Sequence, residues 1–256
     1  MSTLSRVVTL AAALALAGCS STASGAGGGE LALVSPGSLT LCTNPPYPPF
    51  EEKRGEEVVG LDIDVVTEIA DDLGVGLVVV ETGFDGIQSG AALDAGTCDL
   101  AASGITITEA REAKLDFSDP YFDANQALLV PAGSGIDSAA ALAGVKVGVQ
   151  MATTGEAYAK DQGWDTLQYE DTGLQVQALR NGDVGAIVND ALTLEEFADE
   201  TLVIGTEFST GEHYGIAVRT GNSALLAAVN STLARIQSDG TYDAIHAVYF
   251  GASATS

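Results

Sequence analysis

The chain has 256 residues and a formal net charge of −25, from 35 acidic and 10 basic side chains. Its hydrophobic fraction of 46% excludes an acidic disordered protein, because this much apolar surface drives the formation of a core. The acidic balance argues against nucleic acid as a partner, since such a surface repels phosphate. A chain of this length holds one large domain or two modest lobes.

The N-terminal residues predict export. An apolar run over residues 7–17 is too short to cross a bilayer as a helix and is typical of a signal peptide. The run ends in Leu16-Ala17-Gly18-Cys19, which resembles a bacterial lipobox, where the cysteine is acylated after cleavage. We therefore expect a signal peptide over residues 1–18, and a lipidated Cys19 with a flexible linker over residues 19–35. An ordinary secretory signal with an incidental cysteine is the alternative.

Cys42 and Cys98 fall in two predicted strands of an exported chain. An oxidising compartment permits a disulfide between them, but the sequence leaves open whether their Cα atoms approach within about 7 Å. Without a companion pair of histidines they form a poor metal site, so we expect no metal. No P-loop or Gly-x-Ser-x-Gly motif occurs, and we predict neither a cofactor nor a catalytic residue.

Short apolar runs alternate with helical patterns along the body of the chain. The first half predicts strands over 39–43, 77–80 and 99–103, and helices over 62–73, 87–93 and 108–114. The second half predicts strands over 127–130, 145–149, 184–188, 202–204 and 214–218, and helices after Thr153 and over 172–180, 191–198 and 224–236.

This alternation predicts an α/β fold of two lobes, each a mostly parallel sheet flanked by helices. We expect lobe 1 over residues 36–125 and 214–251, and lobe 2 over residues 126–213. Ligands of open parallel sheets bind beyond the carboxyl ends of the strands. The polar residues at these predicted ends are Asn44, Ser103, Gly104, Gln150, Asn189 and Asp190.

The segment over residues 103–111 combines a strand end, exposed backbone amides and one arginine. A guanidinium binds a carboxylate with two parallel hydrogen bonds, so Arg111 with the Thr106 amide is a candidate carboxylate receptor. A surface arginine in an ordinary helix is the alternative. Asp190 either pairs with an ammonium group or caps the helix that follows it.

A proline-dense loop over residues 44–50 holds two aromatic side chains, Tyr47 and Phe50. Because prolines reduce the entropy lost on ordering, the loop is suited to present both rings to a ligand. The alternative is that the rings cover the core. We interpret Asp62 and Asp64 as structural, since carboxylates stabilise the start of a helix.

Residues 39–251 resemble the family 3 extracellular solute-binding proteins, the polar amino-acid receptors of ABC importers. The motifs that carry the resemblance are Tyr47-Pro48-Pro49-Phe50-Glu51, Gly60-Leu61-Asp62-Ile63-Asp64, Phe84-Asp85-Gly86-Ile87, residues 103–111, Val147-Gly148-Val149, Thr153-Thr154 and Asp239-Gly240-Thr241-Tyr242. The resemblance implies a two-lobed fold of the periplasmic-binding-protein type II, which closes around its ligand by hinges at residues 123–127 and 211–215.

The resemblance also implies a role for each candidate residue. Arg111 would bind the ligand α-carboxylate with the amides of Thr106 and Thr154, and Asp190 would bind the α-ammonium with Ser103 or the Gly104 carbonyl. The remaining ligand-binding candidates surround the ligand side chain or line the distal pocket: Asn44, Tyr47, Phe50, Phe84, Gln150, Thr153 and Asn189. Asn44 stands where some binders of basic amino acids carry an aspartate, which weakens the prediction of arginine or lysine as the ligand.

We therefore expect a monomeric binding protein, anchored at the extracellular face of the membrane, that delivers a polar L-amino acid to an ABC permease. Three alternatives remain open. The first is a small-molecule dehydratase on the same scaffold, which would need a free acid or histidine for proton transfer. The second is a ligand-sensing lipoprotein without a transport role. The third is a binder of a compatible solute such as ectoine.

Overall fold

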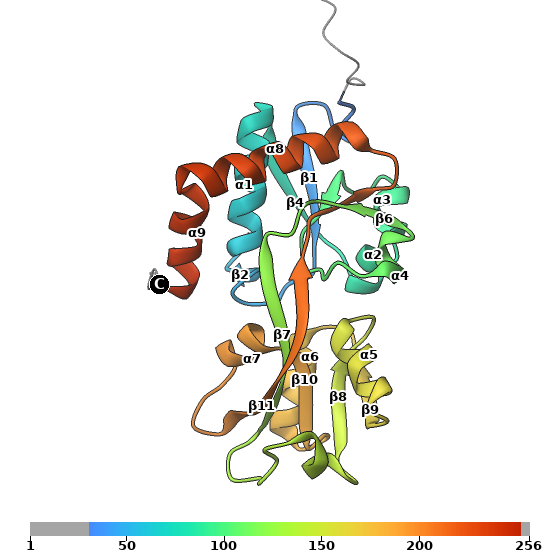
Figure 1. The fold of residues 1–256 in the computed structure, drawn as a ribbon, viewed down its shortest axis with the longest axis vertical. Helices are drawn as coiled ribbons and strands as arrows, with labels where there is room; N and C mark the ends of the chain where they lie inside the picture. Colours follow the sequence, from blue (N-terminus) through green and yellow to red (C-terminus); the bar gives the residue numbers. More distant parts are fainter. Residues whose placement is uncertain (1–30, 252–256) are drawn as a thin grey trace, which may run out of the picture.

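The computed structural model describes residues 31–251. The predicted signal peptide and the predicted lipid anchor at Cys19 lie outside the described residues. Residues 31–251 form two lobes stacked along the long axis of the molecule, each built on a five-stranded sheet (Figure 1). Within these residues, no helix combines the length and the apolar character needed to span a membrane.

The sheet of lobe 1 has the strand order β4-β1-β5-β12-β6. Its strands are β1 (Ser38–Thr43), β4 (Gly76–Glu81), β5 (Leu100–Ala101), β6 (Leu115–Phe117) and β12 (Ala217–Arg219). β1 pairs in parallel with β4 and β5, whereas β12 runs antiparallel to β5 and β6. Since β12 follows all strands of lobe 2 in the sequence, the chain returns to lobe 1 after building lobe 2.

Helices cover both faces of this sheet. They are α1 (Leu61–Leu73), α2 (Phe84–Gln88), α3 (Ala91–Asp94), α4 (Glu109–Glu112), α8 (Ser223–Asp239) and α9 (Thr241–Phe250), and a hairpin of β2 (Glu52–Arg54) and β3 (Glu57–Val59) precedes α1. Because successive side chains of a strand point to opposite faces, Leu41 packs with α1 and α8 while Cys42 packs with α2. α1 ends at Gly74, whose left-handed conformation favours glycine.

Lobe 2 has the strand order β11-β7-β10-β8-β9. Its strands are β7 (Phe122–Pro131), β8 (Lys146–Gln150), β9 (Asp165–Tyr169), β10 (Ala186–Asp190) and β11 (Leu202–Tyr214). Its helices are the short 3-10 helix η1 (Ala139–Leu142), α5 (Thr154–Asp161), α6 (Thr172–Asn181) and α7 (Ala191–Glu196). The Thr153 side chain caps α5 by accepting a hydrogen bond from the Glu156 amide, which places the start of α5 beside the end of β8.

Two adjacent strands, β7 and β11, run from one lobe into the other (Figure 1). They pair antiparallel along most of their length, with His213 opposite Asp123 and Tyr214 opposite Phe122. Because these strands connect the two lobes, some of their side chains border the space between the lobes.

The structure differs from the predicted elements in several places. Each sheet contains as many antiparallel as parallel pairings, because β12 in lobe 1 and β7 in lobe 2 run opposite to their neighbours. The strand predicted over residues 77–80 forms, but it is an edge strand rather than a buried one, and Val78 is 45% exposed. The single helix predicted over residues 87–93 is two short helices, because Gly90 has a positive φ of 82°. Likewise, the strand predicted over residues 214–218 divides between the end of β11 and β12.

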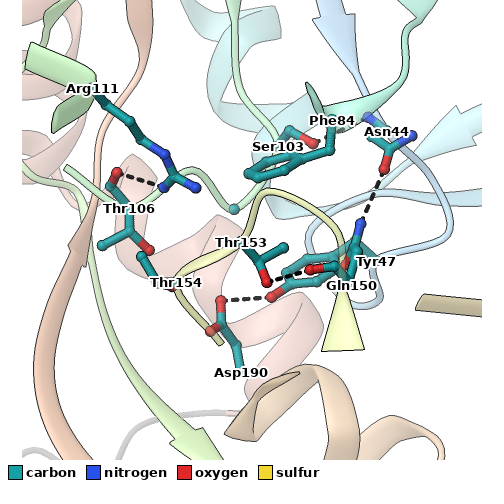
Figure 2. Close-up of a pocket in the computed structure, with 11 residues that line it drawn as sticks. Asn44, Tyr47, Phe84, Ser103, Thr106, Arg111, Gln150, Thr153, Thr154 and Asp190 are labelled. Atoms are coloured by element: carbon teal, nitrogen blue, oxygen red, sulfur yellow. Dashed lines mark hydrogen bonds between the residues drawn. The ribbon is translucent and has the colours of Figure 1, made fainter. Parts of the chain in front are cut away.

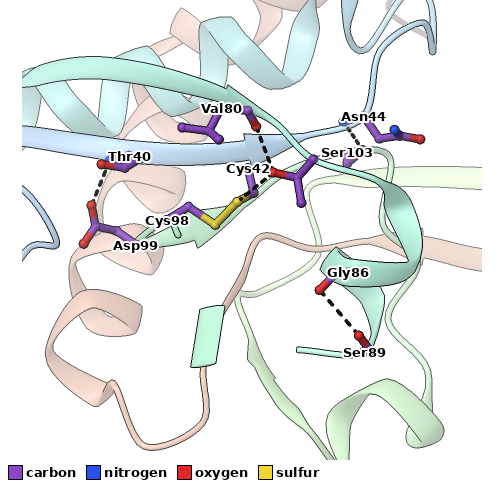
Figure 3. Close-up of a disulfide and its surroundings, with 10 residues drawn as sticks. Thr40, Cys42, Asn44, Val80, Gly86, Ser89, Cys98, Asp99 and Ser103 are labelled. Carbon is purple, nitrogen blue, oxygen red and sulfur yellow. Dashed lines mark hydrogen bonds between the residues drawn. A yellow bond between two sulfur atoms is a disulfide. The ribbon is translucent and has the colours of Figure 1, made fainter. Parts of the chain in front are cut away.

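The two cysteines of lobe 1 lie next to each other (Figure 3). Cys42 and Cys98 form a disulfide, with an S–S distance of 2.06 Å and a Cα–Cα distance of 5.7 Å. Cys42 lies in β1 and Cys98 lies two residues before β5, so the bridge fastens two strands that pair in parallel. The Asp99 side chain reinforces the junction by accepting a hydrogen bond of 2.8 Å from the Thr40 amide.

Replacing both cysteines by serine should lower the free energy of unfolding by about 2–5 kcal/mol, because the unfolded chain regains the freedom of a long closed loop. Urea unfolding of the oxidised wild type and of the double variant measures the difference. Equal unfolding midpoints with equal slopes would contradict a stabilising bridge.

Candidate functional site

A cavity lies between the two lobes. Eleven residues line it: Asn44, Tyr47, Phe84, Ser103, Gly104, Thr106 and Arg111 from lobe 1, and Gln150, Thr153, Thr154 and Asp190 from lobe 2 (Figure 2). All eleven are among the thirteen candidates of the sequence analysis, and their contact with a ligand stays a prediction. The carboxyl ends of the strands of both lobes thus meet at one place.

Arg111 is the basic residue of this lining, and it is 5% exposed. It lies on α4. The Thr108 side chain caps the start of this helix by accepting a hydrogen bond from the Arg111 amide. Its guanidinium donates hydrogen bonds to the carbonyls of Thr106 (2.8 Å) and Ala152 (3.1 Å) and lies 5.2 Å from the centre of the Phe84 ring. Burial lowers the pKa of Arg111 to about 10, so the side chain remains positively charged at neutral pH.

Backbone amides accompany this charge. Among the described residues, the amides of Thr106 and Thr154 donate no hydrogen bond, and Figure 2 shows both residues beside Arg111. Amides without an acceptor are available to a ligand, so these two suit an anion that binds near the guanidinium. A carboxylate, with four acceptor positions, has the capacity to satisfy all three groups.

Asp190 lies in lobe 2, at the junction of β10 and α7, and is 5% exposed. Its carboxylate accepts hydrogen bonds from the hydroxyls of Tyr47 (2.6 Å) and Tyr214 and from the Gln126 side-chain amide. Burial raises the pKa of Asp190 to about 6, with a further contribution from the negative charge of Glu212. At neutral pH the cavity therefore contains a buried carboxylate without a cationic partner, which a ligand ammonium is suited to complete.

The other side of the cavity is neutral. The Gln150 side-chain amide donates a hydrogen bond of 3.2 Å to Asn44 across the lobes, and its oxygen accepts one of 2.8 Å from the Thr172 hydroxyl. These carboxamides can both donate and accept hydrogen bonds, so they suit a polar ligand side chain.

Two buried carboxyl groups outside the lining hold residues of the cavity wall in place by hydrogen bonds. Glu51 accepts a hydrogen bond of 2.5 Å from the Ser103 hydroxyl, and Asp62 accepts one of 2.8 Å from the Gly104 amide. Burial raises the pKa of both groups, that of Asp62 to about 6. Gly104 itself has a φ of 50°, and a Cβ there would lie 2.7 Å from the Tyr47 ring. Asp62 therefore makes structural contacts, but they are with the Gly104 amide of the cavity wall and with the Tyr121 hydroxyl, and not with the start of its own helix.

Two candidates of the sequence analysis do not line the cavity. Phe50 is fully buried, with its ring packed edge-on against Phe122 (4.9 Å) and Tyr214 (5.0 Å), so it covers the core. Asn189 is 1% exposed and lies behind the wall, where it accepts a hydrogen bond of 2.9 Å from the Tyr47 hydroxyl and donates one of 3.1 Å to Gln150. Asn189 thus positions two lining side chains.

The sequence analysis missed Gln126, Glu212 and Tyr214, all of which reach the cavity region from the crossing strands. Gln126 and Tyr214 bind Asp190, and Glu212 accepts hydrogen bonds of 3.3 and 3.0 Å from the hydroxyls of Thr106 and Thr154. The segments that contain them were predicted as hinges, but no spacing signal marked these side chains as facing the cavity.

The model of the family "Bacterial extracellular solute-binding proteins, family 3" matches residues 39–252. A probable histidine-binding protein of Neisseria gonorrhoeae is 33% identical, over 94% of this chain and 94% of its own length. The L-cystine-binding protein TcyJ of Escherichia coli K12 is 35% identical, over 86% of this chain and 85% of its own length.

Two solved structures are similar over 84% of this chain. An ancestral arginine-binding protein bound to arginine is 40% identical, with a TM-score of 0.79 and 99% of its chain covered. An ancestral amino-acid-binding protein that is a precursor of cyclohexadienyl dehydratase is 36% identical, with a TM-score of 0.76 and 95% of its chain covered.

Replacing Asp190 by asparagine should change how stability depends on pH. Because the folded pKa of Asp190 is raised to about 6, the folded wild type binds more protons than the unfolded chain between about pH 4 and 6. The wild type should therefore lose about 1–3 kcal/mol of stability relative to Asp190→Asn as the pH rises through this range. Urea unfolding of both proteins at pH 4, 5, 6 and 7 measures the difference, and a constant difference would contradict the assignment.

Proposed function

Because the chain belongs to the bacterial extracellular solute-binding proteins of family 3, we propose that it captures a polar L-amino acid between its lobes and delivers it to the permease of an ABC importer. The names of its relatives support an amino acid as the ligand, since they specify histidine, cystine and arginine. A shared family alone leaves the ligand open, so the argument rests on the cavity.

One observation carries the proposal: a buried guanidinium from lobe 1 and a buried carboxylate from lobe 2 face the same cavity, and each lobe adds one free amide. A zwitterionic amino acid carries the complementary charges on adjacent groups. Its α-carboxylate binds Arg111 and the amides of Thr106 and Thr154, and its α-ammonium binds Asp190. Charge-assisted hydrogen bonds of this kind are stronger than neutral ones, and the buried setting strengthens them further.

The same geometry supports closure of the lobes on the ligand. Tyr47 binds Asp190, Asn44 binds Gln150, and Arg111 binds the Ala152 carbonyl, each across the lobes. A ligand that bridges Arg111 and Asp190 adds to these contacts only when the lobes are closed, so its binding energy shifts the population toward the closed form. We place the hinges of this closure at residues 123–127 and 211–215. They join lobe 1 (residues 36–125 and 214–251) to lobe 2 (residues 126–213).

We also propose a cellular location and a monomeric state for the protein. The protein acts as a monomer at the extracellular face of the membrane, anchored by a lipid on Cys19. The apolar run and the small residues before Cys19 support the anchor, and the family description supports the extracellular location.

We propose a binding function without catalysis, although a precursor of a dehydratase is among the similar structures. Among residues 31–251, no histidine lines the cavity, and Asp190 is the one carboxylate of its lining. The raised pKa of Asp190 would suit a general acid, which keeps the dehydratase a candidate. However, Asp190 already has three hydrogen-bond donors and is assigned to the ligand ammonium.

Replacing Arg111 by methionine should weaken amino-acid binding by about 100-fold or more, because the α-carboxylate loses its charged partner. A thermal-shift screen of the twenty amino acids identifies a ligand, and calorimetry then compares the variants. Arg219→Met is the matched control, since Arg219 is an exposed arginine at the end of β12. Unchanged affinity in Arg111→Met would show that the carboxylate receptor is wrongly assigned.

Incubation with prephenate or arogenate should leave both compounds chemically unchanged, because a receptor releases what it binds. Nuclear magnetic resonance of the mixture before and after prolonged incubation with the wild type measures this. Product that accumulates with the wild type, and not with Asp190→Asn, would favour the dehydratase.

A further inference from the structure

One oxygen of the Glu212 carboxylate accepts three hydrogen bonds just outside the cavity lining. Its donors are the Thr106 hydroxyl (3.3 Å), the Thr154 hydroxyl (3.0 Å) and the Gln126 side-chain amide (3.0 Å). Glu212 is half-buried, and all three donors are neutral. The proposed function uses the backbone amides of the two threonines, and it gives no role to their hydroxyls or to Glu212.

The backbone that follows Glu212 is fixed to lobe 1. The His213 carbonyl accepts a hydrogen bond of 2.9 Å from the segment over residues 105–107, and the Gly215 amide donates one of 3.1 Å to the same segment. This segment contains Thr106, so Glu212 and Thr106 stay together when the lobes move. Glu212 thus lies on the lobe 1 side of the second proposed hinge.

The other two donors belong to lobe 2. Gln126 on β7 pairs with Asp190 on β10, and Thr154 is the first residue of α5. The pairing of β7 with β11 shifts its register between Phe208 and Glu212, which separates the part of β11 paired with lobe 2 from the end fixed to lobe 1. The hydrogen bonds from Gln126 and Thr154 to Glu212 therefore join the lobes, and they break when the lobes separate.

We propose that Glu212 is a positioning residue that assembles the carboxylate receptor as the lobes close. The receptor is divided between the lobes, because Arg111 and the Thr106 amide belong to lobe 1 and the Thr154 amide belongs to lobe 2 (Figure 2). By binding both threonine hydroxyls, Glu212 holds the two amides side by side near the guanidinium. The inference rests on the proposed function and deepens it by naming the residue that couples closure to recognition of the α-carboxylate.

This role depends on the acceptor oxygen of Glu212 and not on its charge. A negative charge beside the receptor opposes a ligand carboxylate, whereas an oxygen that accepts hydrogen bonds from both lobes holds the receptor together. Removing that oxygen leaves the two hydroxyls and the Gln126 amide without this partner. Glutamine at position 212 keeps the oxygen and removes the charge, and alanine removes both.

Calorimetry of the wild type, Glu212→Ala and Glu212→Gln tests the inference. The probe is L-arginine, or the amino acid that binds the wild type most tightly if the thermal-shift screen finds a tighter one. We expect Glu212→Ala to weaken binding by about tenfold, and Glu212→Gln to bind within about threefold of the wild type. Glu170→Ala is the matched control, since Glu170 is an exposed carboxylate directly after β9, and it should bind as the wild type does.

A variant of the donor provides an independent measurement. Thr154→Val removes the hydroxyl and keeps the backbone amide, so it should also weaken binding by about tenfold. Because both changes break the same contact, the double variant Glu212→Ala with Thr154→Val should bind little more weakly than either single variant.

The α-carboxamide of the same amino acid separates a role in the receptor from a general loss of folding. The wild type should prefer the amino acid over its α-carboxamide, which lacks the anionic charge. This preference should narrow by about threefold or more in Glu212→Ala, whereas a variant that is only less stable keeps it.

Wild-type affinity in a folded Glu212→Ala, or a Glu212→Gln as weak as Glu212→Ala, would overturn the role of Glu212 and leave the proposed function standing. Unchanged affinity in Thr154→Val would do the same, even if Glu212→Ala failed to fold. A wild type that binds none of the twenty amino acids would overturn the proposed function, and this inference with it.

Discussion

Arg111 and Asp190 are buried at one cavity, yet their opposite charges do not pair with each other. Burying a charge is costly unless polar groups surround it. Here carbonyl groups surround the guanidinium, and tyrosine hydroxyls with one amide surround the carboxylate. These neutral partners stabilise each charge without cancelling it, so both remain available to a ligand that carries the two complementary charges.

The rest of the structure keeps these charges in place. The Thr108 cap positions the start of α4 and with it Arg111, while Glu51 binds the Ser103 hydroxyl and Asp62 binds the Gly104 amide. In lobe 2, the junction of β10 and α7 positions Asp190. The crossing strands β7 and β11 serve both lobes at once, because they connect them and also supply Gln126, Glu212 and Tyr214 to the cavity region.

Elements with strong local signals could be predicted from the sequence. The stripe of apolar residues and the terminal Gly74 define α1, and the residues at predicted strand ends identify five of the eleven residues that line the cavity. The contacts and directions of the other side chains depend on packing between residues that are far apart in the sequence. A carboxylate in the first turn of a helix looks the same whether it is solvated or, like Asp62, holds a backbone amide of another segment. Phe50 lies in a predicted motif and Asn189 lies at a predicted strand end, but the direction of their side chains depends on neighbours outside those segments, such as Phe122 and Thr172.

The disulfide shows the same limit, since the sequence permits a bridge between Cys42 and Cys98 but only the pairing of β1 with β5 brings the two together. A crystal structure with arginine bound would show whether the two lobes bind the two charged ends of one zwitterion. We expect the α-carboxylate about 3 Å from the Arg111 guanidinium and the α-ammonium about 3 Å from the Asp190 carboxylate. An amino acid bound in the reverse orientation, or bound through other residues, would contradict this expectation.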